Sequence, residues 1–429
     1  MTRVLLLTTT TGYQTRAFDA AAKTLGVELV FGLDRCRGLE DPWGDHSLAV
    51  RYYDDERSLQ AIVAEAAHEP LAGVIALGDQ PTVLAARAAE ALGLRFHPPD
   101  AARASRNKLE SRRRLAAAGL PVPVFVAADV STPPAELAAS VTFPCVVKPL
   151  ALSGSRGVMR ANDAAEFERA VRRLRHILDA PDVRTMKDPA HRQMLVESYI
   201  EGQEFAVEGL MAGGHLHVLA VFEKPDPLDG PFFEETIYVT PPRIDADARL
   251  RMTRAIAAAA GALGLRDGPV HAECRVNPAG VFVLEAGARP IGGLCARALR
   301  FTGAGGRTIA FEELLLRAAL GEPADAWTRE SCASGVMMIP IPQAGVYRGV
   351  EGVEAAQAVE GIGEVLITAV PDQHLVPLPE GSSYLGFLFA RSADADHAIG
   401  ALRRAHQALR FRIDRELRLA SDYFRFGGV

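Results

Sequence analysis

The sequence lacks several features that each define a class of proteins. It has no run of 18 apolar residues, and its N-terminal "VLLL" is too short for a signal peptide. Its 5 cysteines are scattered and form no C-x-x-C pair, which argues against a disulfide framework or a zinc knuckle. The formal net charge of −6 gives no electrostatic basis for nucleic-acid binding. We therefore expect a cytoplasmic protein that binds neither membranes nor nucleic acids.

The first hundred residues alternate between strand-like and helix-like segments. "RVLLL" and "LAGVIALGD" are apolar runs typical of buried strands, and a helix-like stretch follows each of them. This alternation predicts a parallel α/β domain, in which ligands bind at the carboxyl ends of the strands. No G-x-G-x-x-G occurs, so the dinucleotide fingerprint is absent.

Glycine and proline divide the rest of the chain. A new unit begins near residue 105 with a helix that Gly119 and Pro121 stop. From about residue 331 the pattern is strand, strand and helix. We expect three parts: an N-terminal parallel α/β domain over 1–104, a central unit over 105–325 and a C-terminal α+β domain over 326–429.

The segment "HAECRVNPAGVFVLEAGARP" (271–290) predicts a hairpin of two short strands. In "NPAG", Asn277, Pro278 and Gly280 hold the positions that a type I turn followed by a left-handed residue prefers. This turn predicts a three-residue loop in which Asn277 pairs with Val281. The turn predicts this register, and burial selects it, because a register shifted by one would mix the acids into the apolar face.

In this register Glu273 lies directly opposite Glu285. The other face is apolar, with Val270, Ala272, Cys274, Val276, Phe282, Leu284 and Ala286. Like charges directly opposite each other destabilise a sheet, but a divalent cation between them removes the repulsion. The alternative is a solvated face on which the two acids pair with Arg275 and Arg289.

Five segments of the chain resemble, in order, motifs of the ATP-grasp superfamily of carboxylate–amine ligases. They are "RNKLESRRRLAAAGLPVP", "FPCVVKP", "ALSGSRGV", "LVESYIEGQEF" and "HAECRV…VLEAGARPIGG", and the resemblance covers roughly residues 105–320. It implies an ATP-grasp fold of class α/β, with a pre-ATP-grasp domain before it and a C-terminal unit after it. The ATP-binding core would have a small lobe at about 110–200 and a large lobe at about 201–325.

The resemblance also implies roles for individual residues. The segment "ALSGSRGV" (151–158) would be the phosphate loop, which covers the phosphates of ATP, and "LVESYIEGQEF" (195–205) would be the hinge, which holds its adenine. ATP would contact Lys108, Lys148, Ser153, Ser155, Gly157, Glu197, Tyr199, Ile200 and Glu204. Glu273 and Glu285 would bind Mg²⁺, and Arg289 would lie beside the reacting phosphoryl group. Each residue also has an ordinary structural interpretation: Lys108 as an exposed helix lysine, for example, or Glu197 and Glu204 as solvated strand residues.

Two segments indicate which members of the superfamily the chain resembles most. "EAGARP" replaces E-x-N-x-R, so Gly287 removes an asparagine metal ligand, and this variant resembles the L-amino-acid ligases that form dipeptides. "FEKPDPLDGPFFEETIYVTPP" (222–242) resembles their substrate segment, which implies that Glu235 recognises an amino group. Tyr238 stands where that family has a histidine. The further substrate contacts implied are Lys224, Gly292 and Gly293.

The activity implied is ATP-dependent phosphorylation of a small carboxylate, followed by attack of an amine to form an amide. The cofactors would be ATP and Mg²⁺, with Mn²⁺ as an alternative ion, and a homodimer is expected by analogy. Two other functions stay open: a carboxylating or formyl-phosphate ligase, and a non-catalytic ATP-binding module. Whether His271 or Glu235 acts as a base, or His271 is inert, also stays open.

Overall fold

The computed structural model describes residues 1–9, 14–34 and 47–415. The N-terminal part is a parallel sheet in the order β3-β2-β1-β4, formed by β1 (Thr2–Thr8), β2 (Val27–Asp34), β3 (Leu48–Val50) and β4 (Gly73–Leu77). Both faces of β1 are covered, because Val4 and Leu6 pack into one hydrophobic cluster and Leu5 and Leu7 into another. The helices of this part are α1 (Thr15–Leu25), α2 (Asp55–His68) and α3 (Thr82–Leu92).

Two helices connect this sheet to the rest of the molecule: α4 (Pro99–Arg106) and α5 (Lys108–Ala117). Asn107 separates them and is the N-cap of α5, since its side chain accepts hydrogen bonds from the backbone N–H groups of Leu109 and Glu110. The cap fixes where α5 begins and so places Lys108 in its first turn.

The small lobe is a sheet in the order β5-β8-β6-β7. Its strands are β5 (Phe125–Asp129), β6 (Cys145–Pro149), β7 (Met159–Ala161) and β8 (Gln193–Ser198), and its helices are α6 (Pro134–Ala138), α7 (Ala164–Leu178) and α8 (Pro181–Thr185). Asp163 caps α7, which buries Phe167, Val171 and Leu174 in the lobe's hydrophobic cluster.

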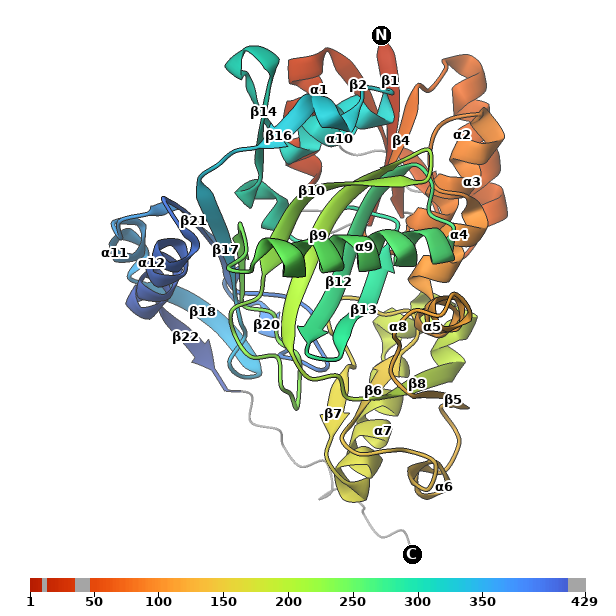
Figure 1. The fold of residues 1–429 in the computed structure, drawn as a ribbon, viewed down its shortest axis with the longest axis vertical. Coiled ribbons are helices and arrows are strands. Elements are labelled where there is room, and N and C mark those ends of the chain that lie inside the picture. The colour runs from red at the N-terminus through yellow and green to blue at the C-terminus, as the bar shows by residue number, and fades with distance from the viewer. Residues whose placement is uncertain (10–13, 35–46, 416–429) are drawn as a thin grey trace, which may run out of the picture.

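An eight-stranded sheet forms the centre of the molecule (Figure 1), in the order β13-β12-β9-β10-β11-β17-β21-β19. Its strands are β9 (Gln203–Ala212), β10 (His215–Glu223), β11 (Ile237–Thr240), β12 (Gly268–Asn277), β13 (Gly280–Gly287), β17 (Ala333–Ile339), β19 (Ile362–Ile367) and β21 (Gly386–Ser392). Helix α9 (Ala246–Leu263) crosses one face of it. Strands from the predicted central and C-terminal units thus share one sheet, through the pairing of β11 with β17. The domain division at residue 326 stays a prediction.

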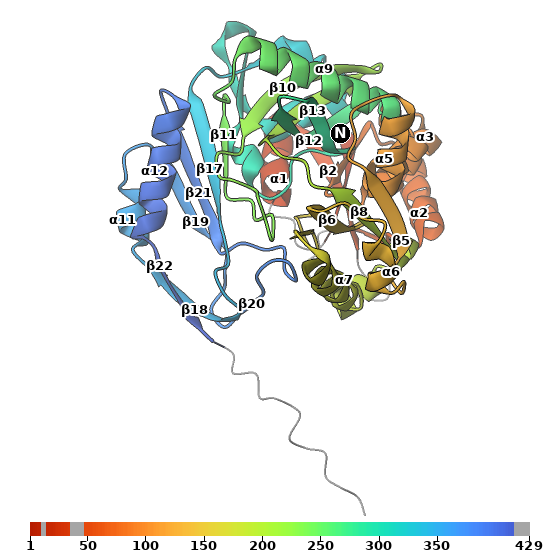
Figure 2. The same cartoon turned by 60° about the horizontal axis from the view of Figure 1, so that its bottom comes forward.

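Shorter elements complete the fold. They are β14 (Arg300–Gly303), β15 (Thr308–Ala310), α10 (Phe311–Ala319), β16 (Trp327–Arg329), β18 (Gly345–Glu351), α11 (Val353–Gln357), β20 (His374–Leu375), α12 (Ala395–Ala408) and β22 (Arg410–Asp414). Helix α10 packs against α1 and β4, so a late segment covers the N-terminal sheet. Figure 2 shows the loop beside β20 reaching toward the small lobe.

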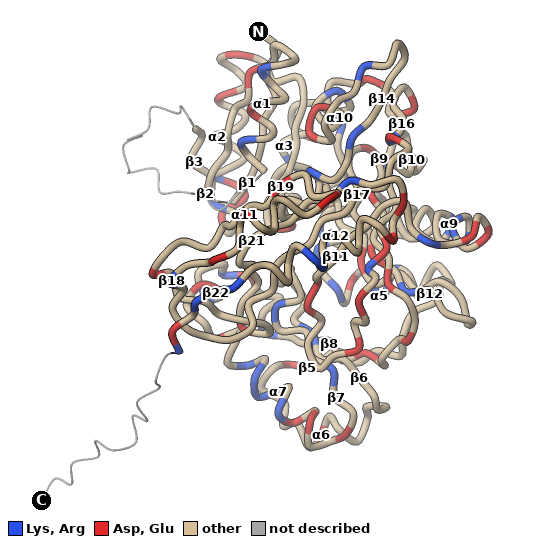
Figure 3. Tube along the Cα trace, turned by 90° about the vertical axis from the view of Figure 1, so that its left-hand side faces the viewer, with Lys and Arg blue, Asp and Glu red and all other residues tan. Residues whose placement is uncertain are grey.

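Charged residues of both signs are interspersed over the described part of the chain. Figure 3 shows Lys and Arg interspersed with Asp and Glu over the trace, in keeping with a formal net charge of −6. Within the described residues, none of the helices is long and apolar enough to cross a membrane.

Candidate active site

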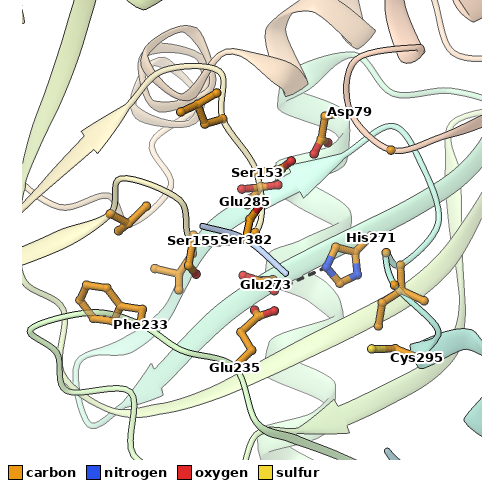
Figure 4. A pocket seen from close by; sticks show the side chains of 18 of the residues that line it. Asp79, Ser153, Ser155, Phe233, Glu235, His271, Glu273, Glu285, Cys295 and Ser382 are labelled. Atoms are coloured by element: carbon orange, nitrogen blue, oxygen red, sulfur yellow. Dashed lines mark ion pairs between the residues drawn. The ribbon is translucent and has the colours of Figure 1, made fainter. Parts of the chain in front are cut away.

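A cavity of about 650 Å³ lies where the N-terminal sheet, the small lobe and the central sheet meet. Most of the residues predicted to form a site line it: Lys108, Lys148, Ser153, Ser155, Glu197, Tyr199, Ile200, Glu204, Glu235, Glu273, Glu285, Arg289, Gly292 and Gly293. Gly157 and Lys224 are not among its lining residues. Figure 4 shows carboxylates and serines from separate elements gathered around this space. The structure therefore brings the predicted residues together, and their individual roles stay predictions.

The hairpin of β12 and β13 pairs Glu273 with Glu285, as the sequence predicted. The turn differs from the prediction, because Asn277 pairs with Gly280 rather than Val281 and the loop has two residues. The register returns to the predicted one through a bulge at Leu284, which lies between the pairs Cys274–Val283 and Glu273–Glu285.

Burial explains the difference. Val281 and Val283 are buried in the core, whereas the predicted apolar face held Phe282 and Leu284, which are only half-buried here. That part of the predicted face is therefore wrong. The β-branched valines pack against α9, and the bulge then lets both Leu284 and Glu285 line the cavity.

Arg112 stabilises this bulge, and the sequence reasoning missed it. Its guanidinium donates hydrogen bonds to the backbone oxygens of Val283 (3.0 Å) and Leu284 (2.7 Å). Its Nε lies 2.5 Å from Glu197 of the hinge, and both side chains are 2% exposed. The signal in the sequence is the spacing of Arg112 three residues from both Leu109 and Leu115, which puts all three on one buried helix face.

Glu197 sits between two cations. Besides Arg112 it contacts the Nζ of Lys148 at 2.5 Å. Burial alone would raise the pKa of Glu197, but the charges of Arg112 and Lys148 outweigh it and lower the pKa to about 2. For Lys148, burial is the larger influence and lowers the pKa despite the attraction of Glu197. Glu197 thus holds the Lys148 ammonium at the cavity wall.

Arg289 is held by a residue from the N-terminal part of the chain. Asp79, which follows β4, accepts hydrogen bonds from Nε (2.7 Å) and Nη2 (3.1 Å) of Arg289. Arg289 Nη2 also lies 3.5 Å from Glu285. Burial would raise the pKa of Asp79, but Arg289 lowers it, so the pair is ionised. Asp79 was not predicted from the sequence. It could have been found from its place after a parallel strand, because ligands bind at the carboxyl ends of such strands.

His271 is buried between two carboxylates. Its Nδ1 contacts Glu208, and its Nε2 lies 3.5 Å from Glu273, an ion pair drawn in Figure 4. Burial would lower the pKa of His271, but Glu208 outweighs it and raises the pKa to about 9. Both ring nitrogens thus face carboxylates, and the role of His271 as a base or as an inert residue stays open.

The predicted phosphate loop lies against the C-terminal segment, here residues 379–384 between β20 and β21. Ser155 has a left-handed backbone with φ of 54°, and the N–H of Gly157 donates a hydrogen bond to Pro379 O at 2.9 Å. Arg156 of the same loop pairs with Asp182 of α8. Lys108 Nζ donates to Leu152 O at 2.8 Å and lies 3.7 Å from Glu285. Lys108 and Arg289 thus lie beside Glu285, and Lys148 lines the same cavity.

Sequence families match three segments of the chain. The ATP-grasp domain matches residues 141–298, the ATP-grasp N-terminal domain residues 18–95, and the L-amino acid ligase C-terminal domain 2 residues 337–414. These matches confirm the predicted fold class.

Individual proteins agree with this assignment. The crystal structure of an L-amino acid ligase from Bacillus licheniformis superposes with a TM-score of 0.81 and 25% identity, covering 97% of this chain and 99% of that one. The uncharacterized protein y4rH of Sinorhizobium fredii is 25% identical over 71% of this chain and 60% of its own length. The alanine–anticapsin ligase of Bacillus subtilis is 28% identical over 44% of this chain and 42% of its own length. The match therefore spans 60% or less of these two curated relatives. The chain belongs to the ATP-grasp superfamily.

Proposed function

We propose that this chain is an ATP- and Mg²⁺-dependent ligase that joins the carboxylate of an α-amino acid to an amine. The observation that carries the proposal is the pairing of Glu273 with Glu285 at a cavity that Lys108, Lys148 and Arg289 also line. Two facing carboxylates offer the hard oxygen ligands that Mg²⁺ prefers, and the three cations suit the charge of a triphosphate. The donor set thus fits a magnesium nucleotide as substrate.

The reaction proceeds in two steps, phosphorylation of the carboxylate and attack of the amine. The substrate carboxylate oxygen takes the γ-phosphoryl group of ATP, and ADP leaves. The amine nitrogen then attacks the carbonyl carbon, a proton is lost from nitrogen, and phosphate leaves as the amide forms. The chain contributes position and charge: Arg289, fixed by Asp79, and Lys148, fixed by Glu197, stabilise the negative charge of the transferring group.

An amino-acid substrate is supported by the segment before β11. Glu235 lines the cavity, and the hydroxyl of Tyr238 donates a hydrogen bond to its Oε1 at 2.7 Å. An anionic carboxylate fixed in this way suits the ammonium group of an amino acid. Gly292 and Gly293 lie on the same wall, and a Cβ built at Gly292 would meet nothing within 4 Å. The wall there leaves room for the backbone of a substrate.

The test is amino-acid-dependent release of ADP and phosphate with MgATP, followed by mass spectrometry of the product. We expect turnover with a subset of amino-acid pairs, loss of more than about 100-fold in Glu285→Gln, and no change in Glu354→Gln, an exposed control. Bicarbonate- or formate-dependent release would assign the chain to the carboxylating or formyl-phosphate ligases instead. Nucleotide binding without turnover across the whole panel would make it a non-catalytic module.

Three further properties belong to this proposal. Mn²⁺ is expected to replace Mg²⁺ in the assay, because both ions accept carboxylate oxygens. We also expect a homodimer, which light scattering of the purified chain tests, and a cytoplasmic location, which cell fractionation tests.

A further inference from the structure

Lys224 occupies a buried position below the candidate active site. It follows the last residue of β10, and its side chain is 3% exposed. Its Nζ lies 2.8 Å from a carboxylate oxygen of each of Glu204, Glu235 and Glu273. An ammonium group has three N–H donors, so these three contacts use all of them. None is left for a phosphate or a substrate, the role that the family resemblance suggested.

The three glutamates would form a cation site if Lys224 were absent. They come from β9, from the segment before β11 and from β12, and one oxygen from each lies within 4.8 Å of the others. Converging carboxylate oxygens are the ligands that hard divalent cations prefer. The Lys224 ammonium therefore stands where a metal ion would otherwise bind, and it is the protein's own counter-charge for this cluster.

Hydrogen bonds reach one oxygen of Glu235 and one oxygen of Glu273, whereas both oxygens of Glu204 accept, one from Lys224 and one from Arg275. Lys224 donates to Oε1 of Glu235 and to Oε1 of Glu273, both at 2.8 Å. The hydroxyl of Tyr238 donates to Oε1 of Glu235 at 2.7 Å and lies 3.2 Å from Oε1 of Glu273. Among the described residues no hydrogen bond reaches Oε2 of either glutamate, although both residues line the cavity. Each carboxylate is thus held by one oxygen and presents the other.

We propose that Lys224 is a positioning residue with two effects. It fixes Glu235 and Glu273 so that each presents Oε2 to the cavity, one toward the substrate's amino group and the other toward the metal of the nucleotide. It also keeps divalent cations out of the three-glutamate cluster, which confines metal binding to Glu273 and Glu285. The identities of the two ligands rest on the proposed function, whereas the exclusion of cations rests on the cluster alone.

Cation exclusion is tested without nucleotide, by electron paramagnetic resonance of Mn²⁺ titrated into the purified chain. We expect Lys224→Met to bind one Mn²⁺ at least about tenfold more tightly than the wild type. Adding Glu204→Gln to Lys224→Met should abolish that gain, because it removes one of the three ligands. Lys23→Met, at a side chain that is 76% exposed, is the matched control and should behave as the wild type.

Thermal unfolding gives a second readout of the same effect. Mn²⁺ should raise the unfolding temperature of Lys224→Met more than that of the wild type, because the variant gains an additional site for the ion in its native state. If Lys224→Met folds only when Mn²⁺ is present, the result also supports the proposal. Equal Mn²⁺ affinity and equal thermal response in a folded Lys224→Met and the wild type would overturn cation exclusion.

Positioning is tested by steady-state kinetics of Lys224→Met/Glu204→Gln, which keeps the net charge of the cluster. We expect the KM for the amino acid and the half-saturating Mg²⁺ concentration each to rise about tenfold. A fall in kcat alone would show a merely structural role and overturn the positioning effect. A wild type that turns over no substrate would refute the proposed function, while the Mn²⁺ experiment would still decide the role of Lys224.

Discussion

At the scale of single residues, the site depends on buried charges that each have a specific partner. Arg112 is the largest fully buried side chain of the described residues, and it joins the hinge to the hairpin through Glu197 and two backbone oxygens. Such a pair contributes little net stability when intact, but removing one partner leaves the other buried and uncompensated. Its function is to fix geometry: Glu197 is oriented from one side by Arg112 and in turn orients Lys148.

Replacing Arg112 should therefore be costly. We expect Arg112→Met to lower the free energy of unfolding by about 3–5 kcal/mol and to weaken nucleotide binding, because Glu197 loses one of its two cations. Urea denaturation and nucleotide titration measure the two effects. Arg113→Met is the control. Arg113 is the exposed neighbour of Arg112, and its replacement should change the free energy of unfolding by less than about 0.5 kcal/mol. A variant of Arg112 as stable as that control would contradict the argument.

His97 predicts a pH dependence of stability. It is 1% exposed; its Nδ1 accepts the backbone N–H of Arg266, so Nε2 carries the proton and donates to Pro269 O at 2.9 Å. Burial lowers its pKa from 6.5 to about 4, so between these values the unfolded chain binds a proton that the folded chain does not. The contribution of His97 to the free energy of unfolding is complete above pH 6.5 and falls by up to about 3 kcal/mol as the pH drops to 4.

The measurement is the difference between wild type and His97→Gln in unfolding free energy from pH 7.5 to pH 4. The variant should be less stable at pH 7.5 and show a shallower decline, so the two curves approach each other as the pH falls. His68→Gln, an exposed control, should run parallel to the wild type. Parallel curves for His97→Gln would show that His97 does not titrate between these values.

The sequence identified most of the charged residues at the cavity but not their partners. Lys148, Glu197, Glu273, Glu285 and Arg289 could be named because family resemblance and local spacing point to them. Partners that lie far away in the sequence could not be found in this way. Asp79, for example, is 210 residues from Arg289, and only the folded chain brings the two together.

At the scale of elements, the hairpin shows how burial overrides turn preference. "NPAG" favours a three-residue loop, yet the loop formed has two residues and the extra residue is placed at Leu284. The turn preference is worth little compared with burying Val281 and Val283, which are 7% and 4% exposed. The pairing of Glu273 with Glu285 was still predicted correctly, because the bulge compensates for the shift in the loop.

The hinge before β9 is packed tightly against the tip of this hairpin. Gly202 has φ of 120°, and a Cβ there would lie 2.4 Å from the backbone oxygen of Val276. We expect Gly202→Ala to push the two segments apart and to lower the unfolding free energy by about 2–4 kcal/mol, with weaker nucleotide binding. Loss of the hydrogen bond from Asn277 Nδ2 to Glu201 O, 2.8 Å here, should accompany it.

Gly213→Ala is the control, at a glycine with a positive φ and no close contact. Gly213 also has a positive φ, 56°, but a Cβ there would meet nothing within 4 Å. Its replacement should cost only about 1–2 kcal/mol and leave nucleotide affinity unchanged. Urea denaturation of both variants measures the difference, and equal costs would show that the contact with Val276 does not matter.

At the scale of the whole molecule, the sequence predicted the order of the parts better than their assembly. Strand and helix segments follow from local patterns, whereas the pairing of Ile237 with Met337 joins strands that are a hundred residues apart. No local pattern encodes such a pairing, so the C-terminal strands could be predicted but not their place in the central sheet. One consequence is that the C-terminal segment supplies Ser382, Ser383 and Tyr384 to the cavity wall.

The same segment connects the small lobe to the rest of the molecule. Arg173 of α7 and Glu380 form a two-pronged ion pair, with Nε–Oε1 at 2.5 Å and Nη2–Oε2 at 2.8 Å. The hydrogen bond from Gly157 to Pro379 lies beside it. The hydrogen bond holds the predicted phosphate loop, and the ion pair holds α7, against the C-terminal segment that also lines the cavity. The ion pair should therefore slow the escape of a bound nucleotide.

A double-mutant cycle of Arg173→Met and Glu380→Gln tests this connection by stopped-flow measurement of nucleotide release. The side chains are 41% and 31% exposed, so the pair is worth about 0.2–1 kcal/mol, and each variant should speed release by up to about fivefold. The double variant should be no faster than the faster single one, and 1 M salt should reduce the difference from wild type. Arg172→Met, whose partner Glu168 lies on the same helix, is the control. Additive effects in the cycle would mean that the two side chains act separately. Retention of the nucleotide would then depend on the backbone contact at Gly157 instead.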